Sequence, residues 1–207
     1  MCFSAPVSFV TGGALGGIGL AAKKHLRKKN DIPLLAIPFV FSFQQIVEGF
    51  VWLGDKQPWQ IYFAYLYVLI AFIFWPAFVP IAFYLQEPSS KVKKLLKYFI
   101  PVGLALSVYL LIFLFINPLL FQIQNNHIIY SYNVPGNWIL MILYLVVTVF
   151  PPLLSSGKYL KLFGALIAVS YLVSLIFFYE ALFSVWCFFA AALSVIVYLH
   201  FRAKRIH

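Results

Sequence analysis

Residues 61–85 read IYFAYLYVLIAFIFWPAFVPIAFYL and contain no charged side chain. A helix of that length is about 37 Å long, which is enough to cross the roughly 30 Å hydrocarbon core of a bilayer. Hydropathy places seven expected spans of this kind near residues 6–22, 33–54, 61–85, 95–116, 138–155, 160–180 and 182–201. The sequence therefore predicts an all-α fold, a seven-transmembrane-helix bundle that forms a single domain over residues 1–207.

The composition is typical of a protein embedded in lipid. Of the 207 residues, 64% are hydrophobic and 10% are charged, whereas ordinary globular chains are about 25% charged. So few charged side chains cannot cover a water-facing surface, which excludes a soluble domain. The seven spans use about 140 positions, so an additional soluble domain does not fit.

Basic residues are confined to alternate connections between the spans. The Lys and Arg residues lie within 23–29, 91–97, 158–161 and 202–205, with Lys56 as the exception. Because short cytoplasmic loops retain positive charge, we expect the N-terminus outside and the C-terminus in the cytoplasm, in a plasma membrane such as the bacterial inner membrane. There the basic loops would attract anionic lipid headgroups. We expect no nucleic-acid partner, which would need a folded basic face or arm.

The longest connection, residues 117–137, contains no Lys or Arg. Its central part is rich in β-branched and aromatic residues on either side of Asn125 and Asn126, and asparagine tolerates the positive φ of tight turns. We therefore expect a short β-hairpin in this outer loop between the fourth and fifth helices. It would lie over the outer mouth of the bundle, with Tyr130 and Tyr132 directed into the mouth or, alternatively, forming part of an interfacial aromatic belt.

The second span carries a carboxyl group, the costliest kind of side chain in this part of the membrane. Glu48 lies about 7.5 Å beyond the middle of the span, where a carboxyl group must be protonated, paired or facing a wet cavity. Gln44, Glu48 and Trp52 recur at four-residue spacing and Gln45 precedes Glu48 by three, so these side chains share one side of the helix. This polar stripe predicts an inward-facing site. Alternatively, Glu48 is a neutral acid bonded within its own helix and the glutamines join helices.

Other unusual residues lie at the same depth or near the outer ends of the spans. Cys187 in the seventh span is about as deep as Glu48, and Trp186 precedes it. The predicted ligand-binding set is Cys2, Gln44, Gln45, Glu48, Trp52, Glu180, Trp186 and Cys187. Alternatively, Cys187 is a small buried hydrophobe, the tryptophans are interfacial anchors, or Cys2 and Cys187 form a disulfide. No comparable cluster is expected in the inner half.

A metal site has little support in the sequence. The histidines are His25, His127, His200 and His207, and none of them is paired in an HxxxH or HExxH pattern. A soft-metal site made by Cys2, Glu48 and Cys187 is an alternative. The sequence indicates no particular cofactor.

Three motifs carry a family resemblance. The opening MCFSAPVSF, the QQIVEG-VW core of the second span and the SVWCFFAA of the seventh resemble an uncharacterised family of prokaryotic seven-helix integral membrane proteins that begin Met-Cys-Phe-Ser-Ala. The resemblance covers nearly the full chain. It implies seven helices and membrane residence, and it supplies neither an activity nor functional residues.

The preferred hypothesis is a plasma-membrane protein whose outward-opening polar pocket binds a small molecule or lipid headgroup, as a sensor or transporter. Glu48 would supply charge or a proton, the glutamines hydrogen bonds, and Trp52 and Trp186 apolar or cation–π walls. An alternative is an intramembrane enzyme in which Cys2, exposed by removal of Met1, is the nucleophile and Glu48 the base. A further alternative is a structural protein whose glycine-rich first span docks a partner.

Overall fold

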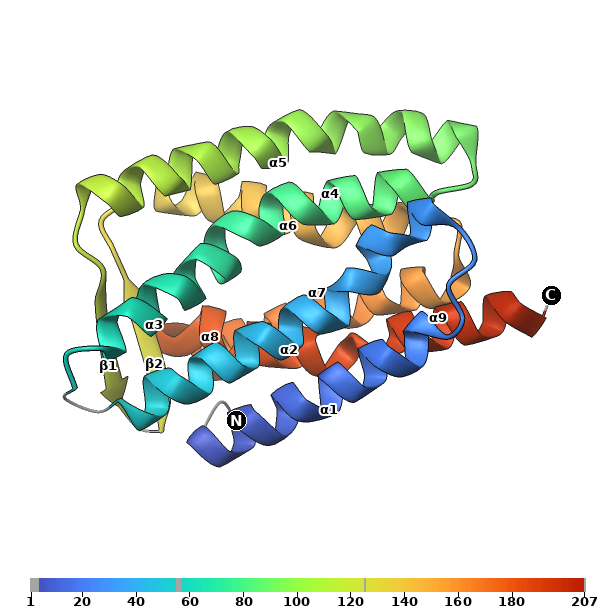
Figure 1. The fold of residues 1–207 in the computed structure, drawn as a ribbon. Coiled ribbons are helices and arrows are strands. Elements are labelled where there is room, and N and C mark those ends of the chain that lie inside the picture. The colour runs from blue at the N-terminus through green and yellow to red at the C-terminus, as the bar shows by residue number, and fades with distance from the viewer. Residues whose placement is uncertain (1–3, 55–56, 125, 207) are drawn as a thin grey trace.

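The computed structural model describes residues 4–54, 57–124 and 126–206 (Figure 1). The described chain runs repeatedly along the length of the bundle, and we call each run a pass. Five passes are single helices: α1 (Ala5–Lys23), α2 (Ile32–Leu53), α5 (Ser90–Ile116), α6 (Asn137–Leu154) and α7 (Lys158–Phe177). Consecutive segments make the other two: α3 (Gln60–Val68), η2 (Leu69–Phe74) and α4 (Trp75–Gln86), then η3 (Tyr179–Ala181), α8 (Leu182–Leu193) and α9 (Val195–Ile206). A short 3-10 turn, η1 (Lys29–Asp31), precedes α2.

Six of these helical segments are long and apolar enough to cross a membrane, which indicates a multi-pass membrane protein. The apolar part of α6, Trp138–Leu154, is shorter. The all-α prediction is therefore confirmed, while the seventh span stays a prediction. The helix bounds lie within a few residues of the expected spans, except that α5 begins five residues earlier, at Ser90, and α9 ends five residues later, at Ile206.

Successive passes run in opposite directions, so the connections gather at two ends (Figure 1). We call one the basic end, which holds the α1–α2, α4–α5 and α6–α7 connections and the C-terminal part of α9. The other is the hairpin end, which holds the two strands and the α2–α3 and α7–α8 connections. The basic residues of 23–29, 91–97, 158–161 and 202–205 belong to the basic end. Lys56 lies outside the described residues.

The segment for which a hairpin was expected forms a two-stranded antiparallel sheet. β1 (Leu120–Gln124) pairs with β2 (His127–Ser131) in the register Leu120↔Ser131 to Gln124↔His127. Asn126 has φ 58°, the left-handed conformation that asparagine accepts in a tight turn. Ile128 is completely buried, and the ring of Tyr130 stacks on that of Tyr67 in α3 at 4.7 Å. The hairpin therefore packs onto the helices.

The first two helices pack closely because α1 presents glycines to α2. A Cβ atom on Gly12 would lie 2.8 Å from Cγ1 of Ile46, and Ser42 Oγ donates a hydrogen bond of 2.6 Å to the Gly12 carbonyl. A side chain on Gly13 or Gly17 would meet nothing within 4 Å. Part of the glycine face is thus used inside the bundle, as the expected close helix packing requires.

The third pass contains a π-helical turn, η2, just before Pro76. The wider turn and the missing proline N–H leave carbonyl groups without their usual backbone donors. Side chains from two neighbouring helices replace those donors: Tyr144 in α6 donates to the Ala71 carbonyl, and Ser107 in α5 donates to the Ile73 carbonyl at 2.7 Å. The irregular turn is thereby satisfied inside the protein, as the bilayer requires.

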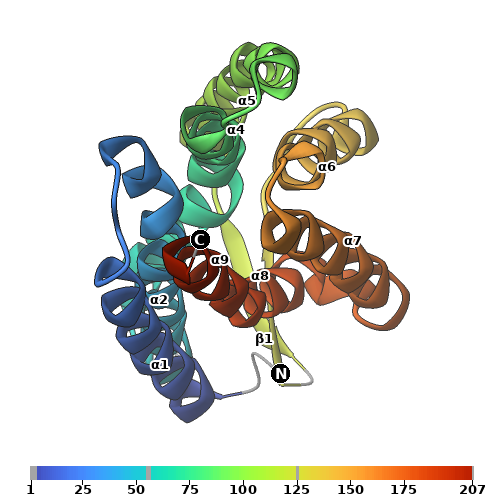
Figure 2. The ribbon, with the colours of Figure 1, turned by 90° about the vertical axis from the view of Figure 1, so that its right-hand side faces the viewer.

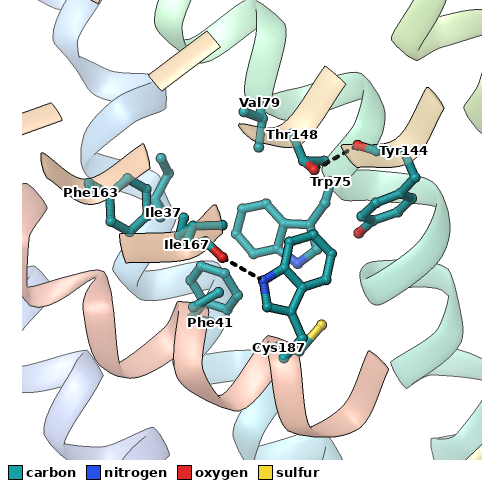
Figure 3. Close-up of a pocket in the computed structure, with 11 residues that line it drawn as sticks. Ile37, Phe41, Trp75, Val79, Tyr144, Thr148, Phe163, Ile167 and Cys187 are labelled. Atoms are coloured by element: carbon teal, nitrogen blue, oxygen red, sulfur yellow. Dashed lines mark hydrogen bonds between the residues drawn. The ribbon is translucent and has the colours of Figure 1, made fainter. Parts of the chain in front are cut away.

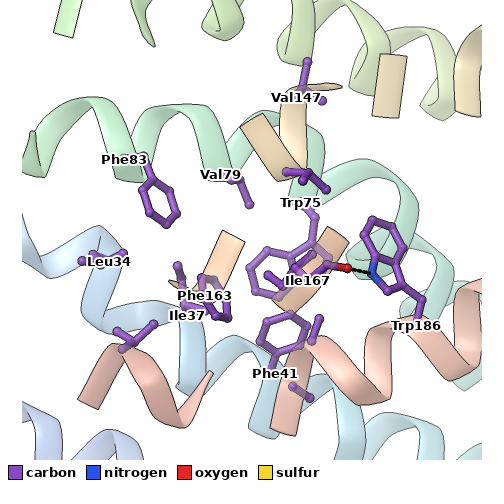
Figure 4. Packing of buried hydrophobic residues seen from close by; sticks show 14 of the residues in the cluster. Leu34, Ile37, Phe41, Trp75, Val79, Phe83, Val147, Phe163, Ile167 and Trp186 are labelled. Atoms are coloured by element: carbon purple, nitrogen blue, oxygen red, sulfur yellow. Dashed lines mark hydrogen bonds between the residues drawn. The ribbon is translucent and has the colours of Figure 1, made fainter. Parts of the chain in front are cut away.

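The last pass completes the core, because α8 and α9 lie between α2 and α7 (Figure 2). Buried side chains from α2, α4, α6, α7 and α8 meet in the middle of the bundle (Figure 4). Phe41 of α2 stacks on Trp75 of α4 with ring centroids 4.2 Å apart. This packing places Gln44, one turn beyond Phe41, at the boundary between the core and the hairpin end.

Candidate functional site

Glu48 is completely buried between α2 and α8. Ser184 Oγ donates a hydrogen bond to its Oε1 at 2.7 Å, and Gln45 Nε2 approaches its Oε2 at 3.4 Å. The short bond joins the second and seventh passes. Glu48 therefore accepts a hydrogen bond from another helix. The alternative interpretation of the sequence, in which Glu48 bonds only within its own helix, does not describe this contact.

Two glutamines beside Glu48 have polar atoms whose hydrogen-bonding capacity is not fully used. Both side chains are fully buried, and Gln44 Oε1 accepts a bond from Trp75 Nε1 at 2.8 Å. Among the described residues, Gln45 Oε1 finds no hydrogen-bond partner, and Gln44 Nε2 has beside it only the Cys187 sulfur, which is a weak acceptor. Because leaving such a buried group unpaired costs about 1–3 kcal/mol, these two atoms mark a place where another polar group would be stabilised.

Cys187 completes this group of side chains. It is a free, buried thiol whose polar neighbours are Gln44, Glu48 and Tyr67. Ser184 and Cys187 are three residues apart, so both face α2 from the same side of α8. We call Gln44, Gln45, Glu48, Ser184 and Cys187 the Glu48 cluster.

Two cavities lie next to the Glu48 cluster. The central cavity, of about 40 Å³, is mainly apolar, and Trp75, Tyr144, Trp186 and Cys187 are among its lining residues (Figure 3). The hairpin cavity, of about 260 Å³, lies between the hairpin and η2, α5, α6 and α8. Tyr144 lines both cavities. Cys187 is the member of the Glu48 cluster that lines the central cavity, and none of the five lines the hairpin cavity, whose α8 residue is Phe183, next to Ser184.

The other predicted site residues do not belong to the cluster, although Trp186 lines the central cavity together with Cys187. Trp186 donates its indole N–H to the Ile167 carbonyl of α7 at 3.2 Å, because it is turned about 100° around α8 from Cys187. Glu180 is exposed and lines a separate surface hollow. Trp52 is half-buried near the end of α2, in the apolar cluster around Val51. Cys2 lies outside the described residues, so its predicted roles stay predictions.

Some members of the site could not be found from the sequence. Trp75 lies on another helix, and nothing in its local pattern indicates a contact with Gln44. Ser184 has a weak signal, since it precedes Cys187 by three residues and therefore shares its face. Within the described ranges, no three His, Cys, Asp or Glu side chains are close enough to hold a metal ion.

A second polar cluster lies at the basic end, the side that the sequence predicted to face inward and to hold no comparable cluster. Asp31 is almost fully buried and pairs with Lys204 through both carboxylate oxygens at 3.0 Å. Glu87, also buried, accepts bonds from Ser155 Oγ at 3.0 Å and the Ser156 N–H at 2.9 Å. In the sequence these acids stand beside the basic segments 23–29 and 91–97. Packing of the turns buries them.

The electrostatics of Glu87 follow from these contacts. Burial alone would raise the pKa of the Glu87 carboxyl, but hydrogen bonds from Ser156, Ser89 and Ser155 stabilise the charged form and together bring the pKa below its usual value. Glu87 therefore remains a carboxylate that fastens the α4–α5 turn to the α6–α7 turn.

Comparison with known proteins gives a family and no activity. No curated protein and no solved structure matches the chain. The family of unknown function DUF6629 matches residues 1–207, which is the whole chain. The chain therefore belongs to DUF6629.

Proposed function

We propose that this protein is a seven-span plasma-membrane protein that binds a small molecule or a lipid headgroup at its hairpin end, as a sensor or a transporter. The observation that carries the proposal is the unused hydrogen-bonding capacity of Gln44 Nε2 and Gln45 Oε1 beside buried Glu48. More than about 90% of buried polar groups in proteins are paired. Two such atoms beside a buried carboxyl, and beside Cys187, which lines the central cavity, support a bound partner.

The proposed orientation places the hairpin end outside and the basic end in the cytoplasm. The basic residues of 23–29, 91–97, 158–161 and 202–205 support it, because positively charged loops are retained on the cytoplasmic side. In this orientation the basic end contacts anionic lipid headgroups. The ligand then reaches the hairpin cavity from the outer side, below the two strands.

The test is the mass of material that stays bound to the protein. The full chain is extracted in nanodiscs of its native lipids, and native mass spectrometry compares the wild type with Glu48→Gln. We expect the wild type to carry an additional mass that Glu48→Gln loses. The matched control is Glu180→Gln, which makes the same chemical change at an exposed carboxylate and should keep the additional mass.

Circular dichroism of each variant shows whether the bundle is folded. If the wild type carries no additional mass, or if Glu48→Gln keeps it, the proposed binding role is wrong. Loss of the mass in Glu180→Gln as well would point to the surface hollow and also contradict the proposal.

A further inference from the structure

The hairpin cavity has predominantly aromatic walls. Its lining includes Phe72 of η2, Tyr130 and Tyr132 of the hairpin segment, Tyr144 of α6 and Phe183 of α8. The remaining lining is Leu110, Ser131, Val134, Leu140 and Met141. None of the lining residues in the described part of the chain carries a charge. Its volume of about 260 Å³ is near the lower end of the range for small-molecule sites, roughly 300–1,000 Å³.

The rings stand as walls at steep angles to one another. Phe72 and Tyr132 meet at 76° with centroids 6.1 Å apart, and Tyr144 and Phe183 meet at 76° with centroids 5.9 Å apart. Phe72 and Phe183 join the two pairs at 4.3 Å. Walls of this kind surround a space from several sides, so a ligand inside it contacts more than one ring.

Contacts outside the cavity hold several of these rings in place. The Tyr144 hydroxyl donates to the Ala71 carbonyl, and Tyr130 stacks on Tyr67 with an interplanar angle of 13°. A preorganised cavity of this type loses little ordering entropy when a ligand enters.

Aromatic walls favour a particular class of ligand. The faces of the rings attract cations, and this attraction grows when the cation is removed from water. A primary ammonium group would need several acceptors to replace its water, whereas a quaternary ammonium group has no N–H to satisfy. The lining offers many rings and few acceptors, which suits the quaternary group.

The Glu48 carboxyl lies behind one wall of the cavity, and in its ionised form it would carry a negative charge there. Ser184 follows Phe183 in α8, and its hydroxyl bonds Glu48 Oε1 at 2.7 Å. In a medium of low dielectric constant, a carboxyl at that position stabilises a cation in the neighbouring cavity over a longer distance than it would in water.

We propose that the hairpin cavity binds a quaternary ammonium group, with Phe72, Tyr130, Tyr132, Tyr144 and Phe183 as a cation–π cage and Glu48 as the countercharge. This inference rests on the proposed function and names the chemical class of its ligand. The group has two sources, a free soluble cation such as choline and the headgroup of phosphatidylcholine.

The experiment compares a cation with its neutral isostere. The full chain is reconstituted in nanodiscs of phosphatidylethanolamine and phosphatidylglycerol, and isothermal titration calorimetry measures binding of choline, tetramethylammonium and 3,3-dimethyl-1-butanol. The last has a carbon atom in place of the choline nitrogen. We expect both cations to bind, and the neutral isostere to bind at least about tenfold more weakly.

Variants locate the binding in the cage. Phe72→Leu and Tyr132→Leu should each weaken choline binding about tenfold, and phenylalanine at position 132 should restore most of the loss because it keeps the ring face. The matched control is Phe63→Leu, since Phe63 stacks on Phe50 at 4.8 Å and lies outside the cavity lining. If the leucine variants do not fold, the comparison of choline with its neutral isostere on the wild type still shows whether binding depends on the positive charge.

A second arm identifies the source of the group. If the lipid headgroup enters the cavity, phosphatidylcholine added to the nanodiscs should compete with choline and weaken its binding. If the site takes a free cation, choline binding should not change. Either result supports the cage. Equal binding of choline and 3,3-dimethyl-1-butanol, or no binding of either cation, overturns it. If Glu48→Gln still loses the additional native mass in that case, the proposed function stands and only the ligand class is wrong.

Discussion

Replacing Ser184 with alanine should destabilise the bundle by about 1.5 kcal/mol. The substitution removes one hydroxyl, which donates a 2.7 Å hydrogen bond to the fully buried Glu48. Interhelical hydrogen bonds in membrane proteins contribute about 0.6 kcal/mol on average and up to about 1.7. We expect a value near the upper end because the acceptor is a carboxyl group, and bonds to charged groups are stronger.

The matched control is Ser194→Ala in the same pass. Ser194, which follows the last residue of α8, is also fully buried, but its hydroxyl donates to the nearby carbonyl of Ala191 in α8 at 2.7 Å. Such a local bond does not join helices, so we expect a loss of about 0.5 kcal/mol or less. The free energy of unfolding is measured by titration with SDS in mixed micelles, followed by tryptophan fluorescence.

A double-mutant cycle assigns the effect to the bond. Glu48→Met removes the carboxyl at similar length, and its coupling energy with Ser184→Ala should be about 1 kcal/mol or more. Coupling below about 0.5 kcal/mol, which is the scatter for independent sites, refutes the reasoning. A loss for Ser184→Ala that equals the loss for Ser194→Ala refutes it as well.

The other predictions concern the basic end and the packing of α4 on α5. Because the folded pKa of Glu87 lies below its ordinary value of 4.5, the Glu87 carboxylate stabilises the fold at neutral pH. This stabilisation is lost as the pH falls from about 4.5 through the folded pKa. The wild type should therefore have a higher melting temperature than Glu87→Gln at pH 7, and the difference in melting temperature should shrink on acidification. A constant difference would contradict this. Gly103→Ala should lower the free energy of unfolding by about 1–3 kcal/mol or more, because a Cβ atom there would collide with the Pro76 carbonyl. Gly13→Ala should be tolerated, because a Cβ atom at position 13 has nothing within 4 Å. Equal free energies of unfolding of the two variants would refute the packing argument.

The sequence determines position along a helix better than rotation about it. Apolar stretches define the spans to within a few residues, and four-residue spacing places Gln44 and Glu48 on one face. Cys187 and Trp186 have almost the same depth, yet only Cys187 faces α2, because the rotation of α8 is set by its packing on neighbouring helices. Depth therefore places Glu48 and Cys187 together, but it does not show that the indole N–H of Trp186 turns to α7; whether these residues bind a ligand stays a prediction.

Features that depend on two or more helices were hidden in the sequence for the same reason. The π-helical turn η2 is stable because Tyr144 and Ser107 supply donors from other helices. The burial of Glu87 depends on the serines of a turn far along the chain. Neither contact leaves a local pattern. The hairpin is the contrasting case, since its strands and its Asn126 turn are local and therefore predictable.

The central claim is that the hairpin end holds a ligand beside the Glu48 cluster, and a cryo-EM map of the full chain in native lipids tests it most directly. The account predicts non-protein density in the hairpin cavity, in contact with Tyr144 and with Phe183, the residue before Ser184. An empty hairpin cavity would contradict it.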